Sequence, residues 1–519
     1  MWRFAIALAA ALAVALASGV AGAAETLRYV GTAKLGEEPP LPIHVELRRE
    51  GPVVTGLFTI PGEEHAVSGS AADNEIKGRI GPGGSAGEFT LRLKGETADG
   101  VFVFGGAPGV LSLKRTTADA QTALGPPPQN LDLTAEQWRA DLGELVRILT
   151  QEHGSPFHRV PRSEFEAEVA RIRSQIPTTS GPHLAAAFRK LSSMIGDGHT
   201  GVDLPRGQPR YPIATFWFED GLRVVQTTPE HRRLLGARVE AVAGVPFKTL
   251  ASRLRPYSPM GENDWSWRAV LPYLINRPTM LQSVGVASET PTSWTFRRPD
   301  GRQERVLLTP AAFPVEGRVL LGGTPPLWAQ RPDEPFWTDF WADSGTLYVN
   351  FRSYQNLAAN AARLAAELDA RRPRRLVLDM RDNGGGDYVK GRELLLPVIT
   401  SRPWLNRRDR TFVLVGRHTF SAAMSNAADF RWRTNTTLVG EPIGEKPNSW
   451  QESRRFYLPH SGLPVSVSTK FYKFAPDGVE QIEPHVRAEP DWRDWARGRD
   501  TAIDRILATR PPRRDGGAS

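Results

Sequence analysis

The segment around Ser421 has the residue order that presents a serine nucleophile. An apolar run at residues 412–415 ends at Gly416, and two alanines follow Ser421 at the start of a stretch with helical character. Backbone N–H groups at a helix start lack intrahelical partners and carry the positive end of the helix dipole, so they favour an oxyanion. The pattern predicts acyl transfer, although a hydroxyl that only caps a helix would look the same locally.

A glycine-rich turn upstream supplies the donors that acyl transfer requires. Residues 375–386 form a hydrophobic strand that ends in three consecutive glycines. Such a turn can aim bare N–H groups into a cleft, because glycine adopts backbone conformations that other residues avoid. We expect the N–H groups of Ala422, Gly384 and Gly385 to stabilise the developing negative charge.

Two residues are candidates for the general base. Lys446 lies 25 residues after Ser421 (446 − 421). A lysine has a reference pKa of about 10.4 and needs desolvation or a positive neighbour to act near neutral pH, and the adjacent Glu445 opposes that shift. His199, in the loop after an amphipathic helix, needs no shift from its reference pKa of about 6.5. We favour His199, which predicts a kcat/KM that rises through a pKa of about 6 to 7, and keep Lys446 as the alternative.

Five motifs in this order resemble the tail-specific, or C-terminal processing, serine peptidase family, and its tricorn-like branch in particular. The resemblance extends over residues 130–490 and implies an endopeptidase that cleaves proteins or peptides through an acyl-enzyme on Ser421. The motifs are residues 191–200, 375–386, 413–430, 438–448 and 479–484.

The resemblance also implies roles for single residues. In the tricorn-like branch a histidine in the matching loop is the base, a serine precedes it, and a glutamate in a Val-Glu-Asn motif supports it. That glutamate corresponds to Glu480, whereas Gly198 replaces the serine. In the processing peptidases with a serine–lysine dyad, Lys446 would be the base. Some relatives bind apolar ligands without proteolysis. The competing interpretation is therefore a non-catalytic protein that holds an apolar ligand or peptide, and the intact Ser421 and His199 favour the enzyme.

The elements that would position these residues predict a multi-domain α+β chain. Short alternating runs divided by turn residues predict an N-terminal all-β domain, a small barrel or sandwich. A capping-box pattern at Thr134 and Gln137 opens a helical section, and a second helix is expected to begin at Ser163. Strands alternating with helices after Gly345 predict an α/β core with a largely parallel sheet, where sites lie at the carboxyl ends of strands.

A PDZ-like domain is expected between the helical section and the core. Such a domain binds an extended peptide as an added strand. Its aromatic insert, which contains Trp265, Trp267 and Tyr273, is expected to be mainly core. The predicted boundaries are a signal peptide at 1–23, a β-rich domain at 25–115, a helical section at 130–204, the PDZ-like domain at 205–310, the peptidase core at 340–490, and a short helix with a disordered tail at 491–519.

The composition limits the cellular compartments and the classes of partner that are compatible with this chain. Residues 1–23 combine Arg3, an apolar core and a small-residue cleavage site, which predicts a bacterial signal peptide and a periplasmic or secreted protein with no integral membrane segment after cleavage. The absence of cysteine excludes disulfides, thiolate metal sites and a cysteine nucleophile. The net charge of +8 comes from scattered arginines, so no nucleic-acid partner is expected. Neither a metal nor a cofactor is expected, because the ten histidines are dispersed.

Overall fold

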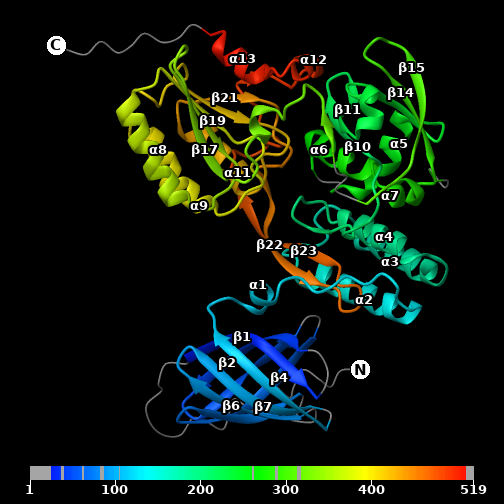
Figure 1. Cartoon of the computed structure of the whole chain (residues 1–519), viewed down its shortest axis with the longest axis vertical. Helices are drawn as coiled ribbons and strands as arrows, with labels where there is room; N and C mark the ends of the chain where they lie inside the picture. The colour runs from blue at the N-terminus through cyan, green and yellow to red at the C-terminus, as the bar shows by residue number, and fades with distance from the viewer. Residues whose placement is uncertain are drawn as a thin grey trace. The chain divides into compact units, whose positions relative to one another are not determined.

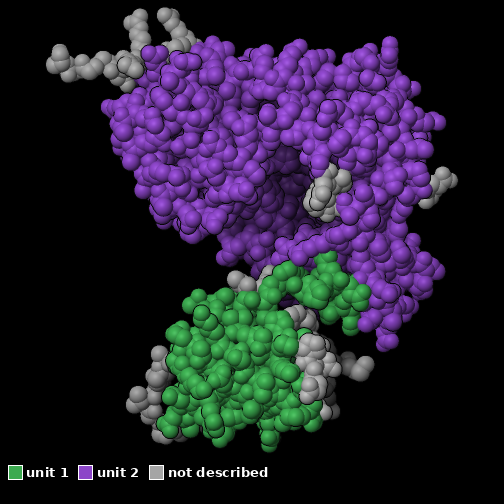
Figure 2. Space-filling model, in the orientation of Figure 1, with its two compact units in different colours: residues 1–130, 457–462 green, residues 131–456, 463–519 purple. Residues whose placement is uncertain are grey.

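The computed structural model describes residues 25–36, 40–60, 63–81, 87–104, 106–259, 262–286, 290–312 and 317–509. The chain forms two compact units, one made of Met1–Asn130 with Tyr457–Gly462 and the other of Leu131–Phe456 with Leu463–Ser519 (Figure 2). The predicted signal peptide at residues 1–23 and the predicted tail beyond residue 509 lie outside the described residues.

The first unit is built on a closed eight-stranded antiparallel barrel (Figure 1). Each strand pairs with the next, and β8 pairs with β1 to close the ring. Side chains alternate between the interior and solvent, as the two-residue period of a strand requires. The prediction of an N-terminal β-rich domain is confirmed, and of the two forms considered it is a barrel. Its strands are β1 Glu25–Leu35, β2 Leu41–Glu50, β3 Val53–Ile60, β4 Glu63–Ala72, β5 Glu75–Ile80, β6 Gly87–Lys94, β7 Thr97–Phe104 and β8 Ala107–Arg115, and a short helix, α1 Ala120–Leu124, follows.

Three helices open the second unit: α2 Ala135–Gln151, α3 Arg162–Gln175 and α4 Gly181–Ser193. The predicted capping box is confirmed, because Thr134 Oγ1 accepts from the N–H of Gln137 at 3.2 Å while Gln137 Oε1 accepts from the N–H of Thr134 at 2.9 Å. The start predicted for the second helix is wrong by one residue. This helix begins at Arg162 after Pro161 with no side-chain cap, since proline is tolerated at a helix start.

A mixed α/β segment follows, with a sheet in the order β10-β11-β12-β14-β15 to which β13 and β16 add short pairs. Trp265 and Trp267 of α6 are buried, as expected for core residues, and Tyr273 is partly exposed. The elements are β10 Ile213–Phe218, β11 Gly221–Thr227, β12 Arg238–Val242, β13 Val245–Pro246, α5 Phe247–Leu254, α6 Asp264–Ile275, α7 Pro278–Ser283, β14 Thr292–Arg297, β15 Gln303–Leu308 and β16 Val319–Leu320.

The largest core surrounds a six-stranded sheet in the order β17-β18-β19-β20-β21-β24. The strands from β18 onward pair in parallel, and β17 pairs antiparallel with β18. The elements are β17 Phe336–Trp341, β18 Thr346–Phe351, α8 Leu357–Arg371, β19 Arg375–Asp379, α9 Tyr388–Lys390, a π-helix Gly391–Leu395, α10 Leu396–Thr400, β20 Thr411–Val415, α11 Ala422–Arg433, β21 Thr437–Gly440 and β24 Val486–Arg487, with α12 Trp492–Ala496 and α13 Thr501–Leu507 after them.

A long hairpin connects this core with the helical section. The hairpin consists of β22 Asn448–Tyr457 and β23 Pro464–Lys473 (Figure 1). Strand β23 pairs antiparallel with the two-residue strand β9 Gly201–Val202. Because β9 begins two residues after His199, this pairing fixes the loop between α4 and β9 against the hairpin. In the part of the chain that the structure describes, no helix has the length and apolarity to span a membrane.

Candidate active site

Ser421 occupies a strained corner between β20 and α11. Its backbone has φ 55° and ψ −126°, a conformation that costs a non-glycine residue of the order of 1–3 kcal/mol and persists where surrounding contacts enforce it. The residue is half-buried, and its Oγ forms no hydrogen bond to another described residue. A strand, a sharp corner and a helix together expose the hydroxyl beside the N-terminus of α11, where developing negative charge is stabilised.

The glycine turn packs directly against this corner. The N–H of Phe420 donates to the carbonyl oxygen of Asn383 at 3.0 Å, and a Cβ built on Gly385 would lie 2.6 Å from Cβ of Ser421. The N–H of Gly385 is engaged with Asn383 Oδ1 at 3.0 Å. Of the predicted oxyanion donors, the N–H groups of Ala422 and Gly384 therefore have no acceptor among the described residues, whereas that of Gly385 is already used.

His199 lies in the loop that leaves α4, after Gly196 at φ +94°. Its side chain is 8% exposed, and its ring stacks on Phe420 with centroids 4.5 Å apart. Burial lowers the pKa of His199 to about 4, because a desolvated imidazolium is unfavourable, and the charge of Asp197 opposes this shift only in part. The imidazole is therefore neutral at physiological pH, and neither ring nitrogen has a hydrogen-bond partner among the described residues.

A buried carboxyl group lies between His199 and Ser421. Oε1 of Glu445 is 3.2 Å from Nδ1 of His199, and Oε2 of the same residue accepts the backbone N–H of Ser421. Burial raises the pKa of Glu445 well above its ordinary value, and the nearby charge of Glu262 acts in the same direction, while the N–H of Ser421 favours the ionised form. One carboxyl group thus contacts both the candidate base and the backbone of the candidate nucleophile.

Two further buried carboxyl groups hold the loop of His199. Glu262 accepts the N–H of Gly198 at 2.9 Å and that of Lys446 at 3.0 Å, and burial raises its pKa to about 7. Asp197 accepts from the Ser468 hydroxyl and lies 2.9 Å from Nε2 of His153. Although burial alone would raise the pKa of Asp197, the contacts with His153 and Ser468 hold it below its ordinary value. Glu262 thus fixes the backbone at Gly198 and Lys446, and Asp197 fixes that of His199 by accepting its N–H at 3.1 Å.

Lys446 and Glu480 contact each other. The Lys446 ammonium donates to Oε2 of Glu480, whose side chain is 72% exposed. The structure therefore brings Ser421, His199, the glycine turn and Glu445 together. The other two predicted residues, Lys446 and Glu480, form an ion pair, and no described contact joins this pair to His199. Sequence reasoning missed the contact of Glu445 with His199, although this glutamate stands inside one of the five motifs.

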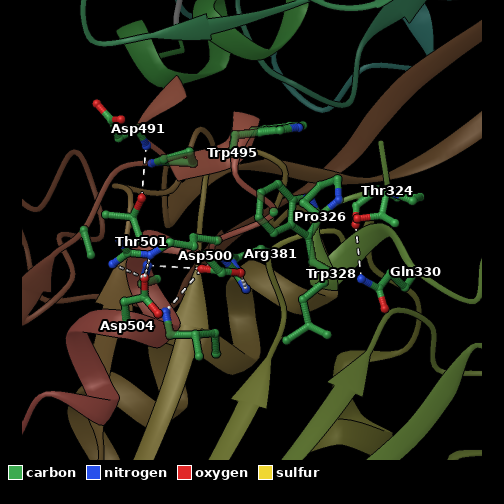
Figure 3. Close-up of a pocket in the computed structure, with 18 of the residues that line it drawn as sticks. Thr324, Pro326, Trp328, Gln330, Arg381, Asp491, Trp495, Asp500, Thr501 and Asp504 are labelled. Atoms are coloured by element: carbon green, nitrogen blue, oxygen red, sulfur yellow. Dashed lines mark hydrogen bonds and ion pairs between the residues drawn. The ribbon is translucent and has the colours of Figure 1, made fainter. Parts of the chain in front are cut away.

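Two cavities accompany these elements. One of about 400 Å³ is bordered by His199, Phe420, Arg417 and Gly444. The other, of about 320 Å³, lies beside Arg381 at the end of β19 (Figure 3), and its lining includes none of the predicted catalytic residues.

Arg381 anchors the strand end that leads into the glycine turn. Figure 3 shows its guanidinium beside Asp500 and Trp328; its Nη atoms donate to Asp500 at 2.8 and 2.9 Å, and it lies 4.4 Å from the ring centroid of Trp328. Arg381 also donates to Asp379 at 2.6 Å, so both carboxylates have a structural partner. Within the described ranges, no group of three or more histidine, aspartate or glutamate side chains is arranged to hold a metal ion.

Comparisons with known proteins find a match within the core. Residues 345–493 match the model of peptidase family S41, whereas no curated protein matches the chain. Among solved structures, mature CPAF is similar at 12% identity over 72% of this chain and 96% of that chain, with a TM-score of 0.48. The photosystem II D1 C-terminal processing protease is similar at 14% identity over 71% of this chain and 99% of that chain, with a TM-score of 0.32. The tricorn protease is similar at 10% identity over 93% of this chain and 58% of that chain, with a TM-score of 0.34.

The close approach of Gly385 to Ser421 predicts a large effect of a single methyl group. Gly385→Ala places a Cβ at φ +106° and 2.6 Å from Cβ of Ser421, so the turn must move, and we expect kcat/KM to fall about 100-fold. Gly384→Ala is the matched control for folding, because a Cβ there meets nothing within 4 Å. Peptide hydrolysis and thermal unfolding of both variants check this, and a Gly385→Ala enzyme with normal kcat/KM would contradict the packing described.

Proposed function

We propose that this chain, a serine peptidase with a peptidase family S41 domain, hydrolyses peptide bonds of protein or peptide substrates through an acyl-enzyme on Ser421. The observation that carries the proposal is that the strained Ser421 and the neutral His199 contact the same buried carboxyl group. The cavity bordered by His199 and Phe420 gives a substrate segment space beside the candidate base, although Ser421 is not among its lining residues.

The proposed reaction uses His199 as the general base. Nε2 of His199 takes the proton of Ser421 as Oγ attacks the scissile carbonyl carbon, and the N–H groups of Ala422 and Gly384 receive the oxyanion. Collapse of the tetrahedral intermediate breaks the C–N bond, and His199 returns the proton to the leaving amine. Water then enters by the same route in reverse and releases the acid from Ser421.

Glu445 is the proposed partner of the base, in the role that the resemblance gives to Glu480. Nδ1 of His199 faces Oε1 of Glu445, which leaves Nε2 for the nucleophile. A buried histidine with a pKa near 4 is a weak proton acceptor. Glu445 compensates in its ionised form, which stabilises the imidazolium as it forms; burial and Glu262 oppose this form by raising the pKa of Glu445. The N–H of Ser421 supports that ionised state of Glu445.

The proposal also covers the cellular compartment of the protein and the way in which it captures a substrate. The pattern of residues 1–23 supports export to the periplasm or secretion. We further propose that the PDZ-like segment at residues 205–310 holds an extended peptide as an added strand, since its sheet ends in the edge strands β10 and β15.

Replacement of the nucleophile tests the reaction itself. Ser421→Ala removes one hydroxyl and little buried area, so we expect hydrolysis to disappear while the Tm changes by less than about 2 °C. A fluorophosphonate probe should label the wild-type chain on Ser421 and leave the variant unlabelled. Turnover that persists in a purified Ser421→Ala preparation would refute the proposed chemistry.

The two candidate bases predict different pH profiles. With His199 as base, kcat/KM falls as pH drops through the pKa of the free enzyme, and burial moves that limb from the usual 6 to 7 toward about 4. A lysine base would instead give a limb that still rises above pH 8. We expect His199→Gln to lose about a thousandfold or more and Lys446→Met much less. The reverse order of losses would make Lys446 the base.

A third comparison separates the two glutamates. Glu445→Gln keeps the size and one acceptor oxygen but removes the charge that offsets the imidazolium, so we expect kcat to fall between 100-fold and about 10⁴-fold. Glu480→Gln removes one half of an ion pair at the surface and should change kcat by less than about threefold. Circular dichroism controls for folding. If Glu445→Gln keeps normal activity and Glu480→Gln is inactive, Glu480 and not Glu445 is the partner of the base.

A further inference from the structure

The N-terminal barrel is packed at one end and hollow at the other. Along β1 the inward positions Leu27 and Tyr29 are 3% and 1% exposed, whereas Ala33 and Leu35, further along the same face, are only half-buried. Because the barrel is closed, inward side chains that are not covered by protein atoms face an internal space.

Strand β7 repeats this gradient on another wall. Ala98 is fully buried, while the inward residues Phe102 and Phe104 near the end of the strand are half-buried. The odd-numbered strands of an up-and-down barrel all end at the same rim, so the uncovered parts of β1 and β7 belong to one end of the barrel.

The space between them is a cavity of about 440 Å³ with almost entirely hydrocarbon walls. This volume lies in the range of small-molecule sites in proteins, about 300–1,000 Å³. Its lining includes Ile43, Phe58 and Leu111, and among the described lining residues only His65 has a polar side chain, with its ring 5.0 Å from that of Phe104. Water in such a space would lack most of its hydrogen bonds, which favours an apolar occupant.

We propose that the barrel binds a neutral, mainly hydrocarbon small molecule in this cavity, as a site separate from the peptidase centre. Among the described residues that line the space there is no lysine, arginine, aspartate or glutamate, so these walls offer a charged ligand no counter-ion in exchange for its lost hydration. Eight strands enclose an interior of the size that holds one small ligand. The ligand class therefore follows from the size of the space and from the apolar side chains of its described lining.

The test uses the full-length chain and the neutral fluorophore N-phenyl-1-naphthylamine. We expect saturable fluorescence enhancement with one site per chain and a micromolar Kd, and the same Kd in Ser421→Ala, because the cavity lies in the other compact unit. Ala33→Trp fills the cavity and should weaken binding at least tenfold. Thr32→Trp is the matched control, since Thr32 is the adjacent residue of β1, is exposed and points outward, and it should bind as the wild type does.

Each outcome decides the proposal. Equal binding by Ala33→Trp and Thr32→Trp, or no saturable binding by the wild-type chain, overturns it. If circular dichroism shows that Ala33→Trp does not fold, Ala33→Phe adds less volume at the same position and should still weaken binding. Competition with dodecanol and dodecyltrimethylammonium tests the ligand class: displacement by the alcohol alone supports a neutral ligand, and equal displacement by the cation contradicts it.

Discussion

The site depends on one buried carboxyl group that contacts both halves of the proposed catalytic pair. Glu445 lies 3.2 Å from Nδ1 of His199 and accepts the backbone N–H of Ser421. A carboxyl group without water must be neutral or compensated, so its position limits how far the histidine loop and the serine corner can separate. Loss of the contact with the N–H of Ser421 would leave a buried carboxyl oxygen without its donor, at a cost of about 1–3 kcal/mol or more for a charged group.

The surrounding contacts make the strain at Ser421 sustainable. Asn383 holds the glycine turn against Phe420. Arg381 donates both to Asp379, the last residue of β19, and to Asp500. On the other side, Glu262 fixes the backbone at Gly198 and Lys446. The unfavourable φ of Ser421 is therefore balanced by several hydrogen bonds from separate elements, which is how strained residues at active sites are normally maintained.

Local patterns predicted the parts of the protein that depend on neighbouring residues. The capping box at Thr134 and the corner at Ser421 follow from residue type and spacing, and they could be predicted from the sequence. The contact between His199 and Glu445 could not be predicted, because it results from the pairing of β9 with β23 and from burial that no local pattern records. Burial also moved the expected pKa of His199, since desolvation depends on the packed environment and not on the residue type.

The pairing of β9 with β23 has a consequence during protein synthesis. The two strands join residues more than 260 positions apart, as in the pair Val202 and Val465 (465 − 202 = 263). A chain emerging from the ribosome completes the helical section long before β23 exists, and long-range pairings of this kind form late. A nascent or truncated chain that ends before β23 thus has the histidine and the serine but not the strand that fixes the histidine loop. On the proposed mechanism, a chain that ends before β23 is therefore expected to lack hydrolytic activity.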